Sequence, residues 1–153
     1  MQAGDRLRAA DEPDLVPAPS RAAAWTAGLW LVAIVALSIT ATLRPQLVLQ
    51  WTRHFPGRDK TGHFLLMGGF AAISVIAFAG RRIGARRISA AGVLAVVAGV
   101  VVLEEFVQLW LPHRTFSLID LVSSLAGVAC FGALAGARQM VFARLRRRAR
   151  GAR

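Results

Sequence analysis

The chain has 153 residues, 56% of them hydrophobic, and carries 19 lysines and arginines against 8 acidic residues. Its apolar residues run together in blocks of about twenty, which is the length that a helix needs to cross a bilayer of ~30 Å. This grouping excludes a soluble domain, and the apolar content excludes a disordered chain. The only cysteine, Cys130, excludes a disulfide scaffold.

Residues 1–22 contain half of the prolines and half of the acidic residues, and we expect them to form a disordered cytoplasmic tail. Each of the apolar blocks that follow is predicted to form a membrane-spanning helix. The four blocks are residues 23–43, 61–80, 88–111 and 118–137. The predicted fold is all-α: an integral membrane four-helix bundle over residues 23–137, with short outer loops and a basic cytoplasmic tail over 138–153.

The basic residues predict the orientation of these spans. Fourteen of the 19 lie before the first block, between the second and third, or after the fourth, and the other five lie in the two remaining loops. Basic residues mark the cytoplasmic side of membrane proteins, so we expect both termini in the cytoplasm and the protein in the inner (plasma) membrane. This topology explains the net charge of +11, and we expect membrane lipids and no nucleic acid as partners. A cleaved signal peptide is disfavoured, because the first apolar run is too long.

Ionisable side chains inside spans are costly, at ~2.5 to 3.5 kcal/mol each near a helix centre, so their positions indicate function. In this chain they gather at the predicted outer ends of three spans and in the loop between the last two. They are Asp59, Lys60 and His63 at the outer end of the second span, Glu104 and Glu105 in the third, Arg114 in the loop and Asp120 in the fourth, and the polar Gln108 lies beside the two glutamates. We predict that they meet in a polar, charged pocket under the outer membrane face.

Helical spacing supports this prediction. Asp59 and His63 are four residues apart and share a helix face, as do Asp120 and Ser124. The adjacent Glu104 and Glu105 point about 100° apart, so only one of them can face the centre of the cluster.

Glu105 shares its face better with Gln108, three residues on, but Glu104 also reaches Gln108 at four residues, so geometry leaves the choice between them open.

These residues resemble the ordered pattern of VanZ-like membrane proteins. The resemblance consists of DKTGHF at 59–64, EFVQ at 105–108, Arg114, Asp120 and Gly127. It implies a four-span bundle, a role in the cell envelope and an effect on sensitivity to glycopeptide antibiotics of the teicoplanin kind. Ser124 departs from the pattern, because the family usually has asparagine there; serine keeps a hydroxyl but loses the carboxamide.

Several functions fit this cluster. The first is binding or modification of an envelope component, such as a lipid-linked precursor or a lipoglycopeptide, with Arg114 and Lys60 contacting an anionic group. The predicted ligand-binding residues are Asp59, Lys60, His63, Glu105, Gln108, Arg114, Asp120 and Ser124. The second is an intramembrane hydrolase or transferase acting on a lipid-linked substrate, with His63 or Glu105 as general acid or base and Asp120 as a further candidate.

A third interpretation is a purely structural polar network that holds the helices together. A metal held by His63, Glu105 and Asp120 is disfavoured, because Lys60 and Arg114 already supply positive charge beside the carboxylates. We therefore expect no metal and no cofactor. Transport is disfavoured by the small number of spans. The oligomeric state stays open.

Overall fold

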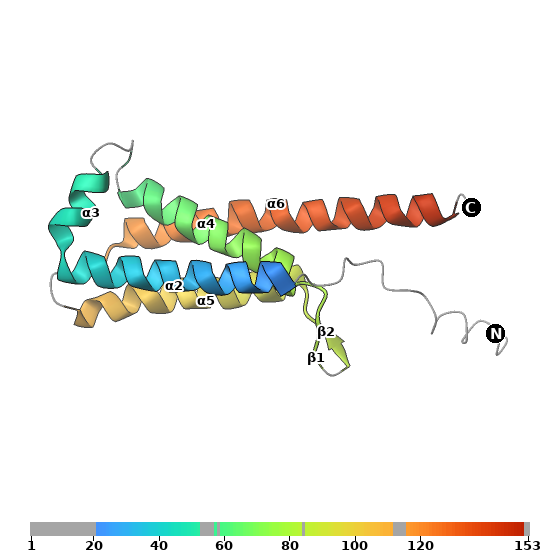
Figure 1. Cartoon of the computed structure of the whole chain (residues 1–153), viewed down its shortest axis with the longest axis horizontal. Coiled ribbons are helices and arrows are strands. Elements are labelled where there is room, and N and C mark those ends of the chain that lie inside the picture. The colour runs from blue at the N-terminus through green and yellow to red at the C-terminus, as the bar shows by residue number, and fades with distance from the viewer. Residues whose placement is uncertain (1–20, 53–56, 58, 84, 112–115, 152–153) are drawn as a thin grey trace.

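The computed structural model describes residues 21–52, 57, 59–83, 85–111 and 116–151. Four helices in it are long and apolar enough to cross a membrane. They are α2 (Arg21–Leu43), α4 (Asp59–Phe78), α5 (Ala90–Val107), which continues into a 3-10 turn (η1, Gln108–Trp110), and α6 (Leu118–Gly151). The predicted class is confirmed: the protein is an all-α, multi-pass membrane protein built from four long helices (Figure 1).

The structure adds elements that the apolar blocks did not predict. A short helix, α3 (Pro45–Thr52), follows α2, and a two-stranded hairpin of β1 (Arg82–Ile83) and β2 (Arg86–Arg87) joins α4 to α5. The fourth helix continues past residue 137, where the apolar block ends, and runs through the basic segment to Gly151. Alanine, leucine and arginine favour helix, and neither glycine nor proline interrupts this segment before Gly151.

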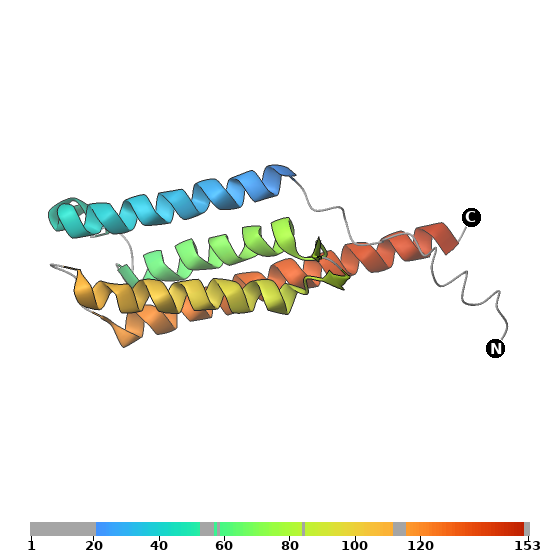
Figure 2. The ribbon, with the colours of Figure 1, turned by 90° about the horizontal axis from the view of Figure 1, so that it is seen from below.

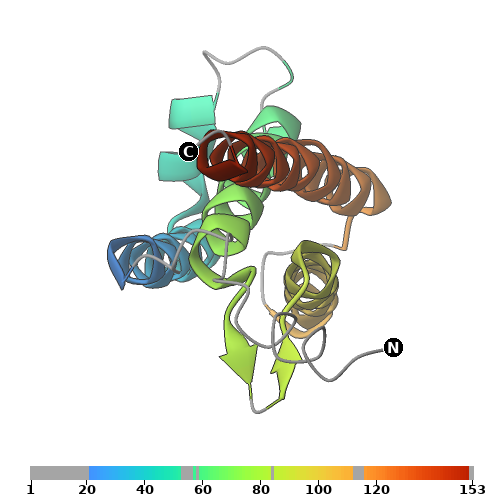
Figure 3. The same cartoon turned by 90° about the vertical axis from the view of Figure 1, so that its right-hand side faces the viewer.

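Helix α4 is the centre of the bundle, since it packs against each of the other three long helices (Figures 2 and 3). Its main partner is α6. A Cβ on Gly127 of α6 would lie 2.1 Å from the carbonyl oxygen of Phe64, so the two backbones meet with no side chain between them. Gly68 of α4 accommodates the Phe131 ring in the same interface. Small residues permit this close approach of membrane helices.

The other helix interfaces are less extensive. Trp30 of α2 packs over Gly69 of α4 and its indole N–H donates to the carbonyl oxygen of Leu66 at 3.1 Å. Gly132 of α6 receives the side chain of Leu94 from α5. The apolar core between the helices is centred on Ala71, Val75, Val97, Val101 and Val128, all of which are buried.

Local signals define the helix ends. Ser89 caps α5 by accepting a hydrogen bond from the backbone N–H of Gly92 at 3.0 Å. Gly80, with φ of 84°, takes the left-handed conformation that lets the chain leave α4 and enter the hairpin. At the opposite end, Ser117 precedes α6 and its hydroxyl accepts from the backbone N–H of Asp120 at 3.3 Å.

The two ends of the bundle are formed by different segments of the chain. One end holds the starts of α4 and α6 together with the ends of α2 and α5, and we call it the polar end (Figure 1). The other end holds the start of α2, the hairpin and the long extension of α6, and we call it the arginine end (Figure 1). Each end therefore gathers segments that are far apart in the sequence.

Candidate functional site

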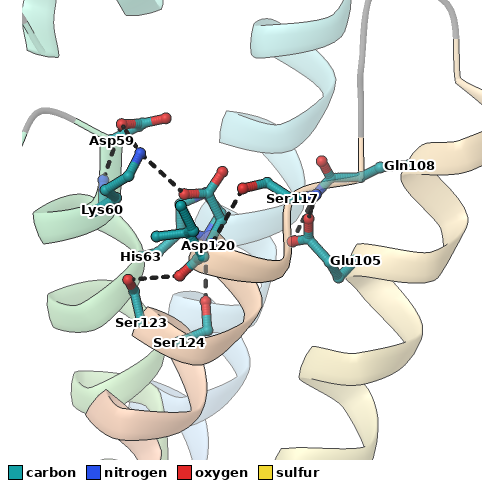
Figure 4. Close-up of polar contacts among 10 residues, drawn as sticks. Asp59, Lys60, His63, Glu105, Gln108, Ser117, Asp120, Ser123 and Ser124 are labelled. Atoms are coloured by element: carbon teal, nitrogen blue, oxygen red, sulfur yellow. Dashed lines mark hydrogen bonds and ion pairs between the residues drawn. The ribbon is translucent and has the colours of Figure 1, made fainter.

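The polar end brings together side chains from α4, α5 and α6 (Figure 4). The first contact is an ion bridge. The Lys60 ammonium lies 3.4 Å from Oδ1 of Asp59, its neighbour on α4, and 3.6 Å from Oδ1 of Asp120 on α6. Lys60 therefore joins the first turns of two helices, and it remains 44% exposed. Both aspartates lie at helix N-termini, where the helix dipole stabilises negative charge.

Asp120 is held in an unusual setting. Its side chain is only 15% exposed, and Oδ1 is buried with no hydrogen-bond donor among the described residues. The Lys60 contact of 3.6 Å is an ion pair that is slightly too long for a hydrogen bond. Lys60 is therefore the cation paired with this buried oxygen in the described part of the chain, and the pair is expected to be sensitive to the loss of either partner.

Glu105 forms the floor of the polar end, with 2% of its surface exposed. Its Oε1 accepts a hydrogen bond from the backbone N–H of Ser117 at 2.8 Å, and its Oε2 lies 3.4 Å from the amide nitrogen of Gln108. Glu105 also lies within electrostatic range of His63, Glu104 and Asp120. Ser117 therefore links the two acidic groups, because its N–H binds Glu105 and its hydroxyl caps Asp120.

Glu104 lies on the flank of the same helix and faces α2. Its Oε1 accepts from the Ser38 hydroxyl and from the Gln108 amide, both at 3.0 Å. Gln108 is buried, and its amide group hydrogen-bonds both glutamates. The spacing of four residues to Glu104 and that of three residues to Glu105 both form contacts. The two glutamates differ in burial, and Glu105, which is the buried one, faces the interior of the bundle.

His63 and Ser124 form a second contact between α4 and α6. The Nδ1 atom of His63 lies 3.2 Å from Oγ of Ser124, which is almost completely buried. Ser124 stands one helical turn below Asp120, and His63 stands one turn below Asp59 (Figure 4). The hydroxyl that replaces the usual asparagine thus retains a polar partner across the helix interface.

The structure brings together the predicted residues that it describes. Three groups are formed: Asp59, Lys60 and Asp120; His63 and Ser124; and Glu105 with Gln108. Arg114 lies outside the described residues. The sequence reasoning did not single out Ser38 or Ser117. Both carry hydroxyl groups beside the acidic groups, but Ser38 lies in the first apolar block, which has no ionisable residue, and Ser117 lies in the short segment before the fourth.

The charge of the described cluster is unbalanced. The cluster contains four carboxylates, those of Asp59, Glu104, Glu105 and Asp120, but one described lysine, Lys60, and the imidazole of His63. Within the described ranges, no three His, Cys, Asp or Glu side chains lie close enough to hold a metal ion. The arrangement is suited to accepting hydrogen bonds from hydroxyl and amine groups and to exchanging protons through His63.

Comparison of the chain with protein-family models, with curated proteins and with solved structures found no match.

Proposed function

We propose that this chain is a VanZ-like membrane protein whose polar end binds a component of the cell envelope. The proposal rests on the exposure of the side chains in the cluster, which falls from its rim to its floor. Asp59 and Lys60 are about half exposed, Asp120 is mostly covered, and Glu105, Gln108 and Ser124 are buried beneath them. A network that only holds helices together has no need for an exposed rim above a buried polar floor.

The proposed orientation places the polar end outside and both termini in the cytoplasm of the inner (plasma) membrane. The support is the asymmetry of charge, since seven arginines follow residue 137 and four lie at or beside the hairpin. The polar end, at the other extremity of the spans, would then face the envelope (Figure 1).

The charges favour one class of ligand group. Lys60 already lies between two carboxylates, so it is less available to an anionic ligand than its sequence position suggests. The four carboxylates favour hydroxyl or amine groups, as on the sugar or peptide part of a lipid-linked precursor or a lipoglycopeptide. Arg114, in the adjacent loop of the sequence, would contact an anionic part of the same ligand. An effect on glycopeptide sensitivity is proposed from the VanZ-like residue pattern.

The test compares membrane abundance with sensitivity to teicoplanin-class antibiotics in the same cells. Asp59→Asn, His63→Ala and Arg114→Lys should keep the protein at wild-type abundance and change sensitivity at least fourfold. The control is Gln46→Ala, an exposed residue of α3 at the same end, which should change neither quantity. Wild-type sensitivity in stable Asp59→Asn and His63→Ala variants would contradict a binding role, and loss of protein in all three would favour the structural network.

A second candidate is an intramembrane hydrolase or transferase. The observation that favours it is the contact of 3.2 Å between His63 and Ser124, which pairs a base with a hydroxyl. Substitutions of Ser124 distinguish the two functions. Ser124→Asn, which introduces the residue usual in VanZ-like proteins, should preserve a binding function but abolish one in which the hydroxyl is the nucleophile. Sensitivity of this variant, scored beside Ser124→Ala, distinguishes them.

A further inference from the structure

Helices α2 and α5 both pack against α4, which lies between them (Figure 3). Helix α5 also packs against α6, whereas α2 and α5 form no comparable interface with each other within the described residues. The first span is also the least buried of the four candidate spans. The bundle is therefore least closed on the side between α2 and α5.

The side chains that border this side of the bundle are apolar and exposed. On α2, Leu31 and Val35 share a helix face with Ser38, which follows them by seven and three residues. On α5, Val100 shares a face with Glu104, four residues on. All three apolar side chains are exposed. In a bilayer, lipid chains would contact them.

A polar contact lies among these apolar side chains. The Ser38 hydroxyl donates to Oε1 of Glu104 at 3.0 Å, and both residues are partly exposed. Glu104 stands six residues before Trp110, the last residue of η1, which is about 9 Å along the helix. An acidic side chain at this depth beside lipid is costly, so its position indicates a function.

Glu104 is connected to the buried floor of the polar end. The amide nitrogen of Gln108 lies 3.0 Å from Oε1 of Glu104 and 3.4 Å from Oε2 of Glu105. The Ser117 N–H donates to Glu105, and the Ser117 hydroxyl accepts from the N–H of Asp120. Hydrogen bonds therefore continue from the flank that faces α2, through α5, to the start of α6.

We propose that the ligand of the polar end is a lipid with a hydroxylated headgroup, which enters from the bilayer between α2 and α5 and donates a hydrogen bond to Glu104. This inference rests on the proposed binding function and names the class of ligand. The Ser38 hydroxyl already donates to Glu104 in the way that a ligand hydroxyl would. A carboxylate oxygen has two lone pairs, so a ligand hydroxyl can join Ser38 or replace it.

The first test is carbodiimide labelling of the full chain in phosphatidylcholine vesicles. Dicyclohexylcarbodiimide dissolves in the hydrocarbon layer and modifies the carboxyl groups that it reaches there, and peptide mass spectrometry locates them. Glu104 should be modified about tenfold faster than its buried neighbour Glu105, which reacts only after a local opening. Val35→Trp places a bulky side chain beside Ser38 and should remove most of this difference. The matched control, Leu134→Trp at an exposed position of α6, should retain it.

The second test is protection of Glu104 by a ligand. Phosphatidylcholine has no hydrogen-bond donor in its headgroup, so the vesicles themselves give the unprotected rate. A glucosyl diacylglycerol added to the vesicles should suppress most of the labelling of Glu104. Methyl glucoside, which carries the same hydroxyl groups but stays in water, should leave the labelling unchanged.

Four results would overturn the proposal. Labelling of Glu104 no faster than that of Glu105, or equal slowing by the two tryptophan substitutions, would mean that the bilayer gives no access between α2 and α5. Protection by methyl glucoside would place the entrance on the aqueous side and leave binding at the polar end intact. Protection by neither compound would exclude the hydroxylated lipid. The proposed function itself is tested separately, through the antibiotic sensitivity of cells with Asp59→Asn, so the two failures are distinguishable.

Discussion

The polar end and the arginine end use charge in opposite ways. At the polar end, acidic groups lie between helices: Glu105, Glu104 and Asp120 contact Ser117, Ser38 and Lys60, which belong to other segments of the chain. At the arginine end, the charges project from a hairpin and from a helix extension that leave the bundle. Charge at the polar end is therefore coupled to helix packing, whereas charge at the arginine end lies mostly on segments outside the packed bundle.

The largest expected effect concerns the packing below the polar end. Gly127→Ala places a methyl group 2.1 Å from the Phe64 carbonyl oxygen, so α4 and α6 must separate. We expect a loss of about 3 kcal/mol or more in stability, at the upper end of overpacking costs. Thermal unfolding in detergent measures it. Gly99→Ala on α5 is the control, because a Cβ there meets nothing within 4 Å; equal effects of the two substitutions would contradict the packing described.

The next effect separates the two glutamates. Glu105→Ala removes a buried side chain and leaves the Ser117 N–H without its acceptor, so we expect a cost of about 2 to 3 kcal/mol. Glu104→Ala removes flank contacts to Ser38 and Gln108 and should cost about 1 kcal/mol, because hydrogen bonds between membrane helices are individually modest. Unfolding midpoints of the two variants in one detergent give the comparison, and the reverse order would contradict the assignment of Glu105 to the interior.

The smallest effect is that of the ion bridge. Lys60→Met leaves the Oδ1 atom of Asp120 buried with neither a hydrogen bond nor a nearby cation among the described residues. The expected cost is small, because the Lys60 ammonium is exposed and solvent screens the pair. Adding Asp120→Asn should recover most of it, because the uncompensated charge is then absent. A double-mutant cycle measures the coupling, and additive effects of the two substitutions would show that the bridge has no energetic role.

The comparison of the two ends also explains which features the sequence could predict. The four spans were predictable because a bilayer requires long apolar runs, and the gathering of Asp59, His63, Glu105 and Asp120 followed from helix length and connectivity. Contacts made by single hydroxyl groups were not predictable. Ser38 looks like its neighbours Thr40 and Thr42 in the sequence, yet the threonines bond the carbonyl oxygens of Ala36 and Ser38 within their own helix, whereas Ser38 reaches Glu104.

The rotation of the helices and the positions of their ends were also not predictable from the sequence. Whether Glu104 or Glu105 turned inward depended on the rotation of α5 against its neighbours, which spacing alone does not determine. The length of α6 beyond residue 137 depended on helix propensity in a polar segment, where no apolar pattern marks an end. The hairpin was not predicted either. The arginines between the second and third spans indicated the orientation of the protein but not a β structure.

Labelling with a membrane-impermeant thiol reagent tests the central claim, that the polar end faces the cell envelope. In a Cys130→Ala background, cysteine is introduced at Gln46, exposed on α3 at the polar end, or at Ala85, exposed in the hairpin. In intact spheroplasts, Gln46→Cys should be labelled and Ala85→Cys should become labelled only after the membrane is permeabilised. Labelling of Ala85→Cys alone in intact spheroplasts would place the polar end in the cytoplasm and contradict a role in binding an envelope component.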